Sequence, residues 1–95
     1  FFSLKRLKRL ELSSKSKIEF IGEAPFFGLE DLEYLSLSSN KLDYLPKDLF
    51  NGLYKLVFLD LSMNNLTEIV PNDFFYCKYL EDIILYGNSN TASRI

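Results

Sequence analysis

A unit of about 24 residues recurs along the chain, and this recurrence constrains the fold more than any other feature. The stretch LEYLSLSSNKL, which begins at Leu32, returns as LVFLDLSMNNL from Leu56, with leucines and an asparagine at the same places. Aligned on these leucines, the units begin at Leu7, Leu32, Leu56 and Leu80, so their spacings are 25, 24 and 24 residues. Self-similarity at this period predicts a solenoid, because one such unit cannot bury its apolar face alone and must stack on its neighbours.

The alternating leucines at the start of each unit predict a short β-strand. A period of two sends Leu35 and Leu37 to the same side of the strand. Strands of successive units are then expected to stack as a parallel sheet, about 4.8 Å apart. The residues expected to point inward and form the core are Leu10, Leu12, Leu35, Leu37, Leu59, Leu61, Ile83 and Leu85.

An asparagine follows three of the four strands, at Asn40, Asn64 and Asn88. A buried side-chain amide has two N–H donors and an acceptor, so it can pair backbone groups in a turn that no regular ladder reaches. In the first unit Lys15 takes this place and offers no acceptor, which predicts an irregular turn. In the last unit Asn90 replaces the expected leucine, and the repeat signal ends there.

A phenylalanine also recurs in the second half of each unit. Phe1, Phe26, Phe50 and Phe74 occupy equivalent places. They are expected to stack as a phenylalanine spine on the side opposite the strands, each ring burying roughly 150 to 250 Å².

This pattern of leucines, asparagine and phenylalanine resembles the leucine-rich repeat family, in the 24-residue form found in extracellular proteins such as Toll-like receptor ectodomains. The resemblance implies an α/β solenoid: a curved right-handed coil with a parallel sheet on its concave face and irregular or short helical turns on its convex side. Both ends are expected to continue into a longer protein. The expected organisation of residues 1–95 is a preceding repeat's tail at 1–6, repeats at 7–31, 32–55 and 56–79, and a partial repeat with a tail at 80–95.

Composition narrows the class of protein. An apolar fraction of 47% excludes disorder, and 95 residues bound the chain to one small domain with a thin core. The uncharged stretches are far shorter than the ~20 residues of a membrane span, so membrane attachment is expected only through parts outside this sequence. The chain has no histidine, so a Ser-His or Cys-His mechanism is unavailable, and no enzyme activity, metal or cofactor is predicted. Cys77 aligns with leucines of the other units, which predicts a buried, unreactive thiol.

Two charge patterns have alternative interpretations. Asp60 and Asp82 face outward on neighbouring strands, displaced by two places and roughly 7 to 8 Å apart. That separation would suit an inverting glycosidase or a shared cation, but two solvated carboxylates on a polar face are favoured. The basic first quarter of the chain suggests nucleic acid by itself, but pairing with acidic residues one turn along is favoured. In the alignment Lys5 and Arg6 lie opposite Glu30 and Asp31, and Lys8 lies opposite Glu33.

The outward face of the strands is the predicted binding site. Tyr34 and Phe58 are neighbours there and form an aromatic column, which either covers the sheet or belongs to a protein-binding hot spot. The second interpretation is favoured, because a solvated sheet does not require exposed aromatic rings. The predicted contact residues are Arg9, Glu11, Tyr34, Ser36, Phe58, Asp60, Asp82, Ile84 and Tyr86.

The predicted function is non-catalytic recognition of a protein ligand or co-receptor through the concave sheet. The resemblance implies a larger receptor or secreted protein, an extracellular or cell-surface location and a role in signal transduction. Asn65 fits the glycosylation pattern Asn-X-Thr, which predicts a glycoprotein. The alternative is a structural or adhesion spacer that forms a homodimer through the same face.

Overall fold

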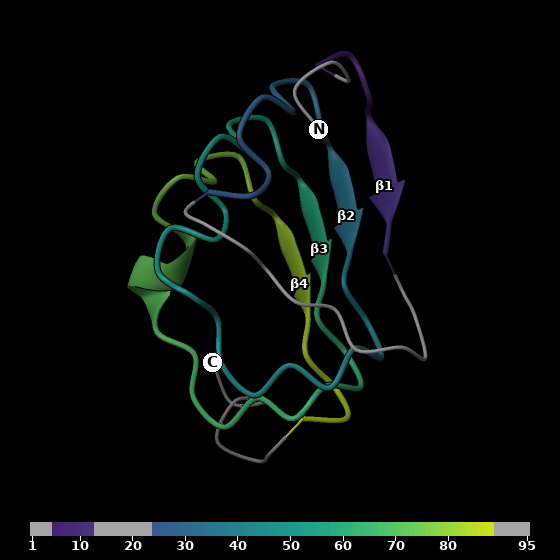
Figure 1. Cartoon of the computed structure of the whole chain (residues 1–95), viewed down its shortest axis with the longest axis vertical. Helices are drawn as coiled ribbons and strands as arrows, with labels where there is room; N and C mark the ends of the chain where they lie inside the picture. Colours follow the sequence, from purple (N-terminus) through teal and green to yellow (C-terminus); the bar gives the residue numbers. More distant parts are fainter. Residues whose placement is uncertain (1–4, 13–23, 89–95) are drawn as a thin grey trace.

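The computed structural model of the chain describes residues 5–12 and 24–88. Its strands form one parallel sheet in which each strand pairs with the next along the chain (Figure 1). The strands are β1 at Arg9–Glu11, β2 at Tyr34–Ser36, β3 at Phe58–Asp60 and β4 at Asp82–Ile84. Consecutive strands start 25, 24 and 24 residues apart, as the repeat predicts. Each turn of the solenoid therefore contributes one strand of three residues.

The register of the sheet aligns equivalent residues of successive units. Leu10 pairs with Leu35, Leu35 with Leu59, and Leu59 with Ile83. Their side chains share the inner face, because residues in register on parallel strands point the same way. The predicted inward set is thus in place.

Burial of this inner face is graded along the solenoid. The leucines of the two middle strands are fully buried, whereas Leu10, Leu12, Ile83 and Leu85 are only half-buried. Sheet order explains the difference, since β1 and β4 each have one neighbouring strand among the described residues, while β2 and β3 have two. Each turn gains its burial from the turns on either side of it.

The asparagines form the expected ladder. The Nδ2 of Asn64 donates to the carbonyl oxygens of Leu37, Leu61 and Ser62 at 3.0, 3.0 and 3.2 Å. The Oδ1 of Asn64 accepts the backbone N–H groups of Asn40 and Leu42, both at 3.0 Å. Each ladder amide therefore bonds to its own turn and to the preceding one.

The two ends of the ladder are less complete. The Oδ1 of Asn88 accepts the backbone N–H of Leu66 at 3.0 Å, so this amide repeats the arrangement one turn later. The Oδ1 of Asn40 is buried and has no hydrogen-bond partner among the described residues. The predictions for Phe1, Lys15 and Asn90 lie outside the described residues.

The phenylalanine spine packs behind the sheet. Phe26 and Phe50 are each 1% exposed, and the Phe50 ring stacks on the half-buried Phe74 ring with centroids 5.7 Å apart. Across the same two turns the outward rings of Tyr34 and Phe58 are 4.8 Å apart. The spine rings are thus further apart than the outward rings of the same two turns, as expected for a solenoid that bends with its sheet on the concave side.

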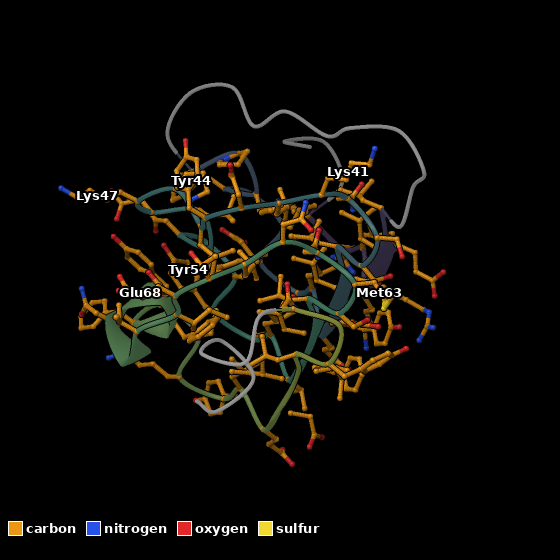
Figure 2. The ribbon with its side chains drawn as sticks, turned by 90° about the horizontal axis from the view of Figure 1, so that it is seen from below. Lys41, Tyr44, Lys47, Tyr54, Met63 and Glu68 are labelled. Atoms are coloured by element: carbon orange, nitrogen blue, oxygen red, sulfur yellow. The ribbon has the colours of Figure 1, made fainter. Side chains whose placement is uncertain are left out.

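The convex side is mostly irregular. The helical element of the described residues is the short 3-10 helix η2 at Pro71–Phe74, which lies across the molecule from the strands (Figure 1). Its first turn is closed by Asp73, whose Oδ2 accepts the backbone N–H of Val70 at 3.0 Å. Lys47 and Glu68 are exposed on this side, opposite the sheet (Figure 2).

Candidate functional site

The outward face of the sheet carries two rows of side chains that cross the strands. The register aligns Arg9, Tyr34, Phe58 and Asp82 in the first row. Glu11, Ser36, Asp60 and Ile84 are aligned in the second row. These residues come from four separate units, and stacking of the turns brings them to one surface. Tyr86 follows β4 by two places and is 66% exposed.

A stack of three side chains dominates the first row. The Arg9 guanidinium carbon lies 3.7 Å from the centroid of the Tyr34 ring. The rings of Tyr34 and Phe58 are parallel within 3°, with centroids 4.8 Å apart. Both rings are half-buried, and the Tyr34 ring lies between the guanidinium and the Phe58 ring, so each ring is only partly open to a partner. Because the three groups fix one another's orientation, less side-chain entropy is lost on binding than with three free side chains.

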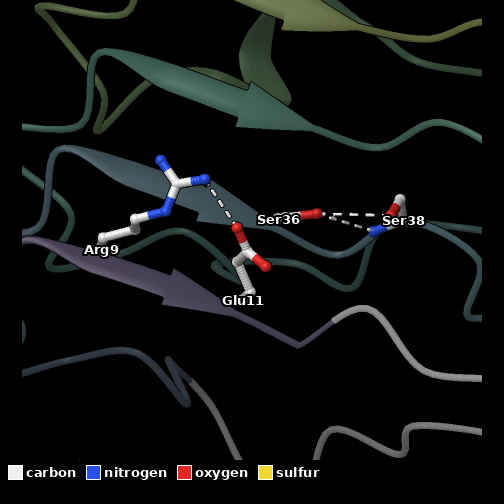
Figure 3. A network of polar contacts seen from close by, with 4 residues as sticks. All are labelled: Arg9, Glu11, Ser36 and Ser38. Atoms are coloured by element: carbon white, nitrogen blue, oxygen red, sulfur yellow. Dashed lines mark hydrogen bonds and ion pairs between the residues drawn. The ribbon is translucent and has the colours of Figure 1, made fainter.

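The charge of Arg9 is balanced on the same strand. Its Nη2 lies 2.6 Å from the Oε1 of Glu11, and the ion pair is exposed to solvent (Figure 3). Such an exposed pair contributes about 1 kcal/mol or less. Its main effect here is to hold the guanidinium over the Tyr34 ring.

The environment of Ser36 does not match the prediction that this residue contacts a partner. It is only 3% exposed, and its hydroxyl is hydrogen-bonded to the Ser38 hydroxyl at 3.3 Å (Figure 3). The physical reason is size, since this short side chain stands in its row between the longer Glu11 and Asp60. Ser36 therefore forms the floor of the face and is not available as a contact residue.

Asp60 is engaged in the turn that follows β3. Its Oδ1 accepts the backbone N–H of Ser62 at 2.9 Å and the Ser62 hydroxyl at 2.7 Å. Asp60 pairs with Ile84 in the sheet register, and Asp82 pairs with Phe58. Asp82 is therefore displaced from Asp60 by two places, as predicted. Within the described part of the chain, no group of three His, Cys, Asp or Glu side chains is placed to hold a metal ion. Asp60 thus has a structural role in the turn.

The β4 side of the face is acidic and partly apolar. Asp82 is exposed, Ile84 is half-buried, and Tyr86 projects beyond them. In residues 5–12 and 24–88, Asp82 makes no ion pair with a basic side chain. The face therefore changes from a balanced charge pair at β1 to an unbalanced carboxylate at β4.

The basic cluster pairs with acidic residues only in part as expected. The Lys8 Nζ lies 3.9 Å from the Glu33 Oε2, which matches the expected pair. Asp31 instead pairs with Lys55 on its other side, at 3.1 Å. The expectation that Asp31 would pair with Arg6 is wrong, because Asp31 has a cation one turn away on each side, Arg6 and Lys55, and pairs with Lys55. Arg6 makes no ion pair within the described ranges.

Cys77 and Asn65 have the environments expected of them. Cys77 is 6% exposed, and burial raises the pKa of its thiol to about 11, which leaves it protonated and unreactive at neutral pH. Asn65 is exposed, and its backbone N–H donates to the Leu42 carbonyl at 2.7 Å. Its side chain is therefore open to solvent on an ordered turn.

The predicted residues omit a hollow beside the first row. This flank hollow has a volume of about 320 Å³ and is lined by Glu33, Lys55, Val57, Tyr79 and Glu81. Most of these residues immediately precede a strand, so the alternation that identifies inward and outward positions does not reach them. The sequence signal that could have found it is at the second place of each unit. Three units have a charged residue there, Lys8, Glu33 and Glu81, whereas the unit that begins at Leu56 has the apolar Val57.

The geometry defines a solenoid of leucine-rich turns with one exposed parallel sheet face. A sequence model of the family described as Leucine rich repeat matches residues 5–66 and 32–89. The chain therefore belongs to the leucine-rich repeat family. Members of this family generally mediate protein–protein interaction and are generally not enzymes. Searches of curated proteins and of solved structures gave no match.

The family occurs in both extracellular and intracellular proteins. The described residues contain no helix of the length and hydropathy that crossing a bilayer requires.

Proposed function

We propose that this chain is a non-catalytic recognition module that binds a protein ligand or co-receptor through the concave face of its sheet. The observation that carries the proposal is the stack of Arg9, Tyr34 and Phe58. Arginine and tyrosine are enriched among the residues that dominate binding energy at protein interfaces. Here they are held in one orientation on a face where packing of the leucine core does not require them.

The surroundings of the stack support the same proposal. Ile84 and Tyr86 extend the apolar surface, and Glu11 and Asp82 place charge at its edges. An apolar centre within a charged rim is the usual arrangement of a protein-binding patch. The proposed setting is a larger receptor or secreted protein at the cell surface or outside the cell, with Asn65 as a candidate glycan acceptor.

The test uses peptides selected from a random library for binding to the 95-residue chain. Replacement of both Tyr34 and Phe58 by serine should weaken binding of these peptides by about thirtyfold or more, since hot-spot truncations cost about 2 kcal/mol or more. The matched control replaces Lys47 and Glu68 by alanine on the opposite side (Figure 2). Circular dichroism should show the same fold in both variants, because the leucine core is unchanged.

Two results would contradict the proposal. One is full binding by the double serine variant, and the other is a loss of binding confined to the Lys47 and Glu68 variant. Either result would place the binding surface away from the concave sheet.

The second candidate function is a structural or adhesion spacer in which this face binds a second copy of the chain. The observation that favours it is the parallel ring stack itself, whose open side at Phe58 could accept another ring. Sedimentation across a range of concentrations distinguishes the two functions. A homodimer that dissociates in the Phe58→Ser variant would support the spacer, and a monomer at all concentrations would exclude it.

A further inference from the structure

The flank hollow lies beside the aromatic column and is open to solvent. Val57, the residue that precedes Phe58, and Tyr79 are the two residues without a charge that line it. Glu33 and Glu81 line the hollow from the turns on either side of Val57. A partner that covers Phe58 therefore also reaches the hollow with its neighbouring side chain.

The backbone fixes the two glutamates at the ends of the hollow. The Glu33 carbonyl accepts the N–H groups of Val57 and Phe58 at 2.9 and 3.0 Å. The Glu81 N–H donates to the Val57 carbonyl at 2.9 Å. Val57 is thus bonded to both neighbours, and the glutamates are two strand spacings apart, about 10 Å.

The charges around the hollow determine which glutamate is free. Lys8 lies 3.9 Å from Glu33, and Lys55 lies 3.1 Å from Asp31. Both lysines therefore already have a carboxylate partner. Glu81 and its neighbour Asp82 have no basic partner in the described ranges, so the unbalanced charge of this region is negative and lies at its β4 end.

From these observations we infer that the flank hollow receives a lysine or arginine side chain of the protein partner. The aliphatic stem packs on Val57 and Tyr79, and the cationic group pairs with Glu81. The inference rests on the proposed function, because it places this side chain next to the residue that covers Phe58. The partner segment thus carries a basic residue beside an apolar or aromatic one.

An acidic side chain in the hollow would be less favourable. It would approach Glu81, and the one lysine that lines the hollow, Lys55, is held by Asp31. Like charges brought together at an interface disfavour the wrong partner. Charge complementarity therefore selects a basic residue.

The test measures how tightly the selected peptides bind two variants of the chain. Each variant removes one negative charge, in one case at the flank hollow and in the other at a hollow on the convex side. Glu81→Gln removes the charge and keeps the shape of the flank hollow. Glu68→Gln is the matched control, because Glu68 is exposed and lines a convex hollow of about 310 Å³ that also contains a tyrosine. Each peptide is titrated in its selected form and with its basic residue replaced by glutamine, which completes a double-mutant cycle.

The selected peptides are expected to contain lysine or arginine beside an apolar residue. Glu81→Gln should weaken their binding about two- to fivefold, in keeping with an exposed ion pair, and the effect should disappear with the glutamine peptide and at high salt. Glu68→Gln should leave the affinity unchanged with either peptide. Coupling between Glu81 and the basic residue is the result that supports the inference.

The failures of the two proposals are distinguishable. Peptides that lack basic residues, or that bind Glu81→Gln as tightly as the unmodified chain, would overturn the basic-residue inference. If those peptides still lose binding to the double serine variant of Tyr34 and Phe58, recognition by the concave face stands. If they bind that variant fully, the proposed function fails as well.

Discussion

Replacement of Asn64 by alanine is expected to destabilise the fold more than any other change in the asparagine ladder. The Asn64 side chain makes five hydrogen bonds and is 4% exposed. Its amide lies between two turns, so its removal affects both of them.

The magnitude follows from which backbone groups lose their partner. The Leu37 and Leu61 carbonyls keep a second donor, from Asn40 and Asn88 respectively, each at 2.9 Å. The Ser62 carbonyl likewise keeps the Ser39 N–H at 3.0 Å.

The Asn40 and Leu42 N–H groups lose Oδ1, the acceptor that the structure gives them. Two unpaired buried donors cost about 1 to 3 kcal/mol each, so the free energy of unfolding should fall by about 2 to 6 kcal/mol.

Urea unfolding followed by circular dichroism measures this cost, with Asn65→Ala as the matched control. Asn65 is exposed, so its replacement should change the stability by no more than about 0.5 kcal/mol. Asn88→Ala should lie between the two, because Asn88 is half-buried and accepts one backbone N–H. Equal shifts for Asn64→Ala and Asn65→Ala would refute the role given to the ladder.

Two further changes test the core. Phe50→Ala should lower the free energy of unfolding by about 3 to 5 kcal/mol, because it removes the middle ring of the spine, and an unchanged urea midpoint would mean that the ring contributes little. The Cys77 thiol should react slowly with Ellman's reagent until urea unfolds the chain, since its pKa is raised to about 11. Between pH 9 and 11 the unfolded chain loses this proton and the folded chain keeps it, so the stability conferred by the neutral thiol is lost as pH rises. The stability gap between the unmodified chain and Cys77→Ala should therefore narrow over that range, and a constant gap would contradict the raised pKa.

The sequence by itself determined the features that recur in every turn. The leucine alternation predicts strands such as Tyr34–Ser36 and Phe58–Asp60 in their observed register, and the asparagines and phenylalanines predict the ladder and the spine. These features can be predicted because every turn has to pair the same backbone groups and cover the same part of its neighbours. The same residue types therefore recur at the same places in successive units.

The tertiary structure decided what depends on the particular side chains of adjacent turns. Ser36 is buried because longer residues stand beside it, and Asp31 pairs with Lys55 although Arg6 holds the equivalent place on its other side. Met63 adopts a left-handed backbone with φ of 57°, which nothing in a methionine predicts and which the turn after the strand requires.

The flank hollow is also a feature that the tertiary structure decided. Val57 leaves space only because Tyr79, Lys55 and the two glutamates lie around it in three dimensions. A repeat pattern gives the position of each residue in its own turn. The space left between side chains of neighbouring turns is set by their sizes and charges together, and so appears only when the turns are stacked.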